Sequence, residues 1–222
     1  MLSRVDRALV RVEAKTKPLL RGVSHQVGFF VALLAGTLLV HVARGTLASA
    51  SAAVYATTLA ALLGTSALYH RPTWGAQTRA LLRRCDHAAI YLLIAGTFTP
   101  VMALALPGRA TLPLALAWTG AAAGIAKNLA WPSAPKWLEA ALCVALGWIA
   151  VPFLPALRQL LSTADISLLV IGGLAYSVGA LVYALKVPDP VPQVFGYHEV
   201  FHALVLVAAG CHFAVVWTLV TR

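Results

Sequence analysis

The chain has 222 residues, of which 60% are hydrophobic and 11% are charged, and its formal net charge is +10. Soluble domains carry about 25% charged residues, so this composition excludes the ordinary soluble globular class. The apolar residues form long runs, and the positive charges lie mainly in the short segments between the runs. We therefore predict one membrane domain and expect no nucleic-acid partner.

The apolar runs give the number of helices that cross the membrane. One crossing needs about 20 apolar residues, because each helical residue rises about 1.5 Å. Seven runs reach or approach this length, and in chain order they are Val23 to Val42, Leu47 to Tyr69, Asp86 to Leu106, Ala110 to Ala126, Trp137 to Leu157, Ile166 to Leu185 and Tyr197 to Val220. The predicted fold is an all-α integral membrane bundle of seven transmembrane helices over residues 23–222, after a basic tail at residues 1–22.

The basic residues orient this bundle. Short loops rich in Lys and Arg stay in the cytoplasm. Thirteen of the 17 basic residues fall on one predicted side, namely Arg4, Arg7, Arg11, Lys15, Lys17, Arg21, Arg71, Arg79, Arg83, Arg84, Lys127, Lys136 and Lys186. We therefore expect the N-terminus in the cytoplasm and, with an odd number of spans, the C-terminus outside, in a multi-pass protein of the cell membrane.

Polar residues inside the spans converge at one depth. Span two ends with Ser66 and His70, which share a helix face four residues apart. Span three starts from the same cytoplasmic side with Asp86, and span seven starts there with His198 and His202, again four residues apart. Because polar residues inside a membrane are costly, such a convergence predicts a functional site.

The residue types at this depth favour zinc. Three neutral imidazoles, here His70, His198 and His202, form a known catalytic zinc arrangement with an open fourth position. Zinc would polarise a carbonyl group and lower the pKa of a bound water, while Asp86 could act as general base and Ser66 could hold the same water. Taken singly, each residue could instead be a hydrogen-bonding or helix-capping group.

Other polar residues converge less well. His25 and His41 lie at opposite ends of span one, and His212 lies ten residues beyond His202. His87 points about 100° away from its neighbour Asp86 on the helix. We interpret these four histidines as structural. Glu139, near the start of span five, is either a boundary charge or a partner of the metal ligands.

The segment His198 to His202 reads HEVFH and therefore also matches the H-E-x-x-H pattern of metalloproteases, in which the glutamate is the general base. An intramembrane protease would leave the residues of spans two and three unexplained. Glu199 instead fits an ion-pair or helix-start residue, because it lies in the first turn of its helix.

Three segments resemble one known family. SALYH at Ser66 to His70, DHAAIY at Asp86 to Tyr91 followed by IAGTFTP at Ile94 to Pro100, and FGYHEVFH at Phe195 to His202 are similar to bacterial hemolysin III proteins of the progestin and adipoQ receptor (PAQR) family. The resemblance implies zinc bound by the three histidines, with Asp86 and Ser66 near the metal-bound water. It also implies hydrolysis of lipid amides, as in related receptors and alkaline ceramidases.

Three hypotheses follow. The first is a zinc-dependent hydrolase that cleaves a ceramide-like lipid amide or an ester, with a membrane lipid as substrate or ligand. The second is a non-enzymatic protein, either receptor-like or of a hemolysin or pore type, in which zinc is structural. The third is the intramembrane metalloprotease. The sequence leaves the particular lipid and the oligomeric state open.

Overall fold

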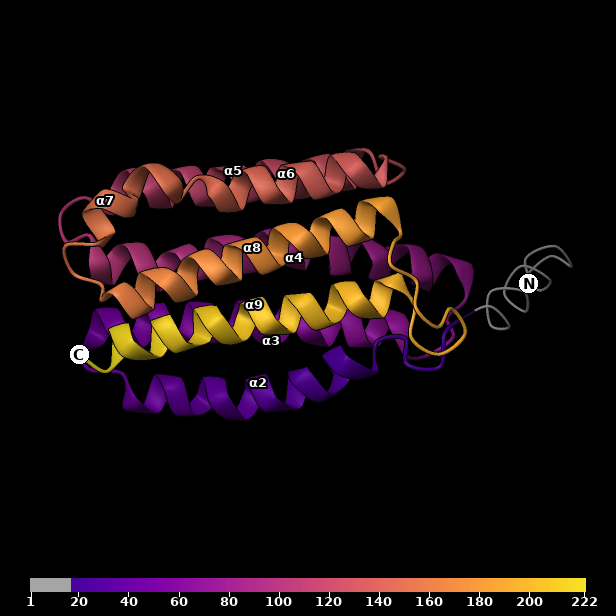
Figure 1. Cartoon of the computed structure of the whole chain (residues 1–222), viewed down its shortest axis with the longest axis horizontal. Helices are drawn as coiled ribbons and strands as arrows, with labels where there is room; N and C mark the ends of the chain where they lie inside the picture. Colours follow the sequence, from indigo (N-terminus) through magenta and orange to yellow (C-terminus); the bar gives the residue numbers. More distant parts are fainter. Residues whose placement is uncertain (1–16) are drawn as a thin grey trace, which may run out of the picture.

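A computed structural model describes residues 17–222 as a bundle of helices that lie along one long axis (Figure 1). The regular elements of this range are all helical, and in chain order they are α2 (Val23–Val42), α3 (Thr46–His70), α4 (Ala76–Ala105), α5 (Thr111–Ala130), α6 (Lys136–Trp148), the 3-10 helix η1 (Val151–Phe153), α7 (Leu154–Leu157), α8 (Thr163–Leu185) and α9 (Tyr197–Val220). Most of the predicted basic tail, residues 1–16, lies outside the described residues.

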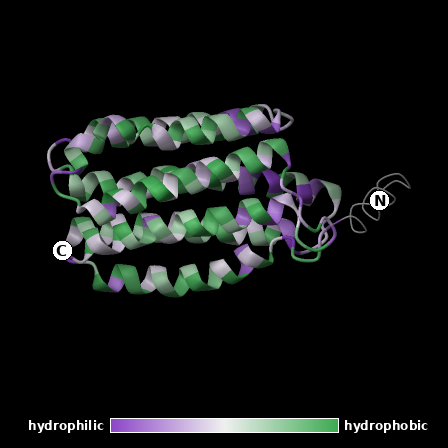
Figure 2. Cartoon of the chain, in the orientation of Figure 1, coloured by the Kyte–Doolittle hydropathy of each residue, from purple (hydrophilic) through white to green (hydrophobic). Residues whose placement is uncertain are grey.

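The outer surface of the bundle is suited to lipid. Large apolar side chains point outward along its helices; Leu34, for example, is 76% exposed and Phe30 is 58% exposed. Figure 2 shows that hydrophilic residues gather at the end of the bundle where α2 starts, whereas the lengths of the helices are mainly hydrophobic. Within residues 17–222, six helical segments are long and apolar enough to cross a membrane. The fold is that of a helical membrane protein.

The predicted spans agree with the helices to different degrees. The predicted bounds of the first and last spans are those of α2 and α9. Helix α4 begins at Ala76, ten residues before the predicted start at Asp86, because the segment between them is helical but rich in arginine. The fifth predicted span is one apolar segment but not one helix. It breaks after Trp148, where Pro152 cannot donate a backbone hydrogen bond.

The fourth predicted span corresponds to α5, which is 20 residues long. It is not among the six apolar segments, because Pro113, Lys127 and Asn128 lower its mean hydropathy. Helix α5 packs against α4 and α6, so it belongs to the bundle.

Close helix packing depends on small residues at a few positions. A Cβ atom added to Gly96 on α4 would lie 2.0 Å from Oγ1 and 2.8 Å from Cβ of Thr58 on α3. The helices α3 and α4 therefore approach as near as glycine allows, as is common between membrane helices. Helix α9 then closes the bundle, since it contacts α2, α3, α4 and α8.

We expect Gly96→Ala to destabilise the protein, because the new methyl group must push α3 and α4 apart. Overpacking of this kind costs about 1–3 kcal/mol, which should lower the thermal midpoint by several degrees in detergent. Gly173→Ala on α8 is the matched control, because no atom lies within 4 Å of its added Cβ. Equal midpoints for the two variants would contradict the close α3–α4 contact.

Candidate metal centre

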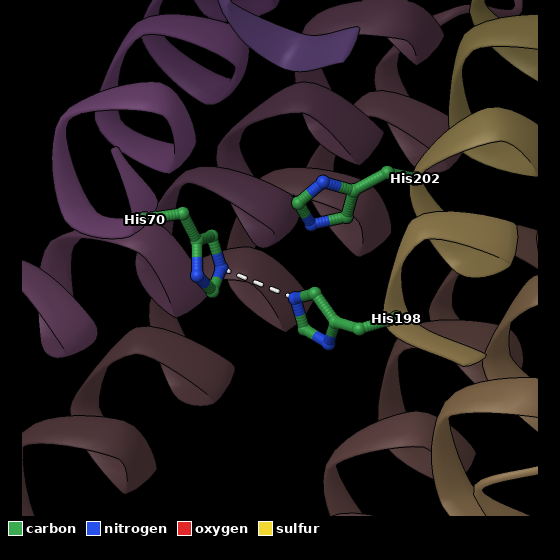
Figure 3. A group of neighbouring side chains, drawn as sticks. All are labelled: His70, His198 and His202. Atoms are coloured by element: carbon green, nitrogen blue, oxygen red, sulfur yellow. Dashed lines mark hydrogen bonds between the residues drawn. The ribbon is translucent and has the colours of Figure 1, made fainter. Parts of the chain in front are cut away.

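Three histidine side chains from two helices face one another at the end of the bundle where α2 starts, the histidine end (Figure 3). His70 is the last residue of α3, and His198 and His202 lie in the first two turns of α9. One nitrogen from each ring lies within 4.8 Å of the other two, and Nε2 of His70 is 3.1 Å from Nε2 of His198. The three side chains are close enough to bind a metal ion.

The start of α9 is fixed by the residues around its first turn. Glu199 Oε2 accepts a hydrogen bond from the Gly196 backbone N–H at 2.9 Å, which caps the helix. Glu199 Oε1 lies 2.5 Å from Nε of Arg21, in the segment before α2. The prediction that Glu199 is an ion-pair and helix-start residue is confirmed. With this carboxylate at the cap, the i, i+4 spacing turns both α9 histidines toward α3.

Asp86 and Ser66 lie beside the histidines, as their shared depth predicted. Oδ2 of Asp86 is 3.7 Å from Nε2 of His70, and the Asp86 side chain is buried. Ser66 is buried one helical turn before His70. Both residues line the same cavity as His198 and His202. The structure thus brings together all five of the residues that the sequence singled out.

His25 is a sixth member of the cluster, although the sequence analysis gave it a structural role. Its ring stacks on that of His202, with centroids 3.7 Å apart and planes 7° apart. Its Nδ1 lies 2.8 Å from Oγ of Ser66. The sequence did hold a signal for this placement, because span one starts at the same boundary as Asp86 and His198. His25 connects α2 to both histidine-bearing helices.

The remaining polar residues fall into two groups. His41 is exposed, and His212 Nε2 lies 3.3 Å from the Leu169 carbonyl oxygen, so both stay outside the cluster. His87 and Glu139 instead line the cavities next to Asp86, and the buried Glu139 carboxylate pairs with Lys127. Glu139 is therefore a paired charge near the centre and not a contact of the three histidines.

An apolar cavity of about 210 Å³ extends from the cluster into the bundle. Its walls come mainly from α4, α6, α8 and α9, with side chains such as Leu93, Phe98, Val144 and Phe201. Asp86, His198 and His202 lie at its histidine end. Binding sites for small molecules commonly combine mainly apolar walls with a few converging polar groups, and this cavity has that form.

The sequence comparisons agree with this architecture. The family described as "Haemolysin-III related" matches residues 13–213. Hemolysin-3 of Bacillus cereus is 33% identical over 192 residues, which are 83% of each chain, and the Hemolysin-3 homolog of Bacillus subtilis is 32% identical over 138 residues, which are 62% of each chain.

A plant relative extends the resemblance beyond bacteria. The heptahelical transmembrane protein ADIPOR2 of rice (Oryza sativa subsp. japonica) is 35% identical over 150 residues, which are 59% of this chain and 64% of that protein. The chain thus spans less than two thirds of the Bacillus subtilis and rice relatives, whereas the family match covers nearly all of it. These matches and the helical bundle lead to one conclusion: the chain is a multi-pass membrane protein that belongs to the haemolysin-III-related family.

Proposed function

We propose that this protein is a zinc-dependent membrane hydrolase that cleaves the amide or ester bond of a lipid. The proposal rests chiefly on one observation, the grouping of three buried imidazoles with the Asp86 carboxylate at the polar end of an apolar cavity. A metal ion and a base together can hydrolyse a carbonyl compound, and an apolar cavity can accommodate a lipid chain.

The donor set fits zinc. Each of the three rings offers one nitrogen to the space between them, and these nitrogens all lie within 4.8 Å of one another (Figure 3). Zinc is bound by nitrogens at about 2.0–2.1 Å in a tetrahedral arrangement, which keeps two such nitrogens about 3.3 Å apart. The separation of 3.1 Å between His70 and His198 is near that value. When bound, zinc would polarise the substrate carbonyl and make water more acidic.

The side chains around the histidines have separate roles in the proposed reaction. Asp86 takes a proton from the attacking water, whose oxygen forms a bond with the carbonyl carbon. The carbon–nitrogen or carbon–oxygen bond then breaks, and Asp86 returns the proton to the leaving amine or alcohol. A hydrogen bond of 2.8 Å joins Oγ of Ser66 and Nδ1 of His25, and the His25 ring stacks on the His202 ring and so supports its position. The fatty acid remains in the apolar cavity.

The two other hypotheses have less support. A metalloprotease of the H-E-x-x-H type needs Glu199 as general base, but both carboxylate oxygens of Glu199 are engaged, one by Arg21 and one by the Gly196 N–H. A water-filled pore needs a polar lining, whereas the cavity walls are mainly apolar. A receptor-like protein with structural zinc would use the same cavity for a ligand, and it differs from the hydrolase in needing no base at Asp86.

We also propose seven spans, with the N-terminus in the cytoplasm and the C-terminus outside. Support comes from α5, which lies alongside α4 and α6, and from the name of the rice relative, heptahelical. The start of α2 and the end of α9 lie at opposite ends of the bundle (Figure 1), as an odd number of crossings requires.

A reporter fused after Arg222 tests this topology. We expect an alkaline phosphatase fusion there to be active, because that enzyme needs an oxidising compartment outside the cytoplasm. A fusion in the connection between α5 and α6, at Ser133, should be inactive. An active Ser133 fusion or an inactive Arg222 fusion would contradict the seven-span arrangement.

Zinc content tests the metal centre. Purified wild-type protein should contain about one zinc per chain, and His70→Ala and His202→Ala should each reduce this to less than about a tenth, since two remaining imidazoles bind weakly. Elemental analysis by mass spectrometry measures the ratio and identifies any other metal. His41→Ala is the matched control, because it removes an exposed histidine outside the cluster. Metal-free wild-type protein, or loss in His202→Ala alone, would overturn the three-histidine site.

Substitution of Asp86 tests catalysis separately from metal binding. Asp86→Asn should keep the zinc and lose at least about 100-fold in hydrolysis of long-chain acyl amides or esters, because the amide side chain cannot accept the proton. The control Asp165→Asn changes a buried aspartate in the first turn of α8, a helix that starts at the opposite end of the bundle (Figure 1). Full activity in Asp86→Asn would remove it from the mechanism. A zinc-loaded wild type that cleaves none of these lipids would favour the receptor-like hypothesis.

A further inference from the structure

A second cavity lies at the histidine end, where His70 and His198 line it. This cavity, the vestibule, has a volume of about 250 Å³, and its charged lining includes Arg21, Arg79, Arg83 and Lys136. Its walls come from the segment before α2, the start of α4, the connection between α5 and α6, and the start of α9. Unlike the apolar cavity, the vestibule is lined largely by polar groups.

The apolar cavity and the vestibule meet at the candidate metal centre. Five residues line both of them, namely Asp86, His87, Glu139, Tyr183 and His198. If the bond that reacts lies beside His198 and Asp86, one end of the molecule can therefore extend into the apolar cavity and the other end into the vestibule. An apolar chain suits the apolar cavity on one side of the centre, and a polar group suits the vestibule on the other.

Of the basic residues that line the vestibule, Arg21 is paired with Glu199, whereas the acids that line it do not pair with Lys136. Glu139 is paired with Lys127, which does not line the vestibule, and Asp86 faces His70. Nζ of Lys136 lies 4.7 Å from the ring centroid of Tyr183 and 3.2 Å from the Tyr197 hydroxyl. Among residues 17–222, no carboxylate lies within ion-pair distance of the Lys136 ammonium group. The two tyrosines hold this group in place, so it is available to bind an anion in the vestibule.

Membrane topology alone does not explain these cations. The rule that keeps Lys and Arg at the cytoplasmic end places no requirement on where their side chains point. Arg71, Arg84 and Lys186 satisfy that rule at the same end without lining the vestibule. The four basic residues that line it are therefore a feature of the cavity, next to the proposed reaction centre.

We propose that the lipid substrate carries an anion, a carboxylate or a phosphate, on its amine part, and that this anion binds in the vestibule beside Lys136. This inference rests on the proposed hydrolase function and specifies its substrate as the amide of a long-chain fatty acid with an anionic amine. Hydrolysis adds water across the carbon–nitrogen bond and gives a fatty acid and an amine. The fatty acid returns to the bilayer from the apolar cavity, and the charged amine leaves through the vestibule into water.

Binding measurements test the inference independently of turnover. Three probes share one acyl chain: N-palmitoylglycine has a carboxylate, N-palmitoylethanolamine is neutral, and its phosphate ester carries a phosphate. Dissociation constants are measured for zinc-loaded protein in nanodiscs of neutral lipid. We expect at least one anionic probe to bind about tenfold more tightly than the neutral one, and this preference to weaken as salt screens the charges. The comparison of the two anionic probes identifies which anion fits.

Three variants locate the anion. Lys136→Gln should reduce the preference for the anionic probe by about threefold or more, and Lys136→Arg should retain it. Lys186→Gln is the matched control, because it removes one exposed positive charge from the same end but outside the vestibule. Equal binding of charged and neutral probes by the wild type, or an unchanged preference in Lys136→Gln, would overturn the inference.

The outcomes for binding and for hydrolysis are separate. Cleavage of the neutral amide as fast as the anionic ones, with equal binding, would refute the anionic substrate and leave the hydrolase intact. A charge-dependent preference that needs Lys136, without cleavage of any probe, would refute the hydrolase and keep the anionic lipid as a ligand.

Discussion

The cost of burying imidazole and carboxylate groups in a bundle surrounded by lipid is the constraint on which the rest of this structure depends. At the histidine end this cost is offset by contacts between helices. His25 pairs with Ser66 across α2 and α3, Asp86 approaches His70 across α4 and α3, and Arg21 pairs with Glu199 across the segment before α2 and α9. These contacts join the consecutive helices α2, α3 and α4 to one another, and they tie the segment before α2 to α9 at the other end of the chain. The polar groups of the candidate metal centre thus also determine how these helices pack against one another.

Much of the fold could be predicted from the sequence because lipid requires apolar residues at nearly every outward position. The ends of α2 and α9 coincide with the ends of two apolar runs. The start of α4 was missed because the helix continues beyond the apolar run through Arg79, Arg83 and Arg84, and hydropathy does not distinguish an arginine-rich helix from a loop. The break after Trp148 could have been anticipated from Pro152, since proline removes a helical hydrogen bond.

For the candidate site, the sequence predicts at which membrane depth each residue lies and which face of its helix the residue occupies. Span order places His70, Asp86 and His198 at one boundary, and the i, i+4 spacing places His202 on the same face as His198. His25 shares that boundary, but its role depends on ring stacking, which hydropathy does not encode. The two cavities could not be predicted from the sequence, because they are spaces left between packed side chains, those of α4, α6, α8 and α9 for the apolar cavity and those of helix ends and connections for the vestibule. The position of a residue along the chain therefore predicts which residues lie together, whereas side-chain packing determines the cavities between them.

The position of the candidate centre between two unlike cavities bears on how the proposed hydrolase would reach a lipid substrate. The carbonyl group of a membrane lipid lies where the hydrocarbon ends and the polar layer begins. The three histidines lie between a cavity with apolar walls and a vestibule whose lining includes Arg79, Arg83 and Lys136, and we propose that this place corresponds to the depth of that carbonyl. In the proposed hydrolase, a lipid that moves sideways into this site would keep its chain in an apolar environment and its head group in a polar one throughout. Little solvation is lost on entry, so the binding energy of both ends remains available to hold the carbonyl beside Asp86 and His198.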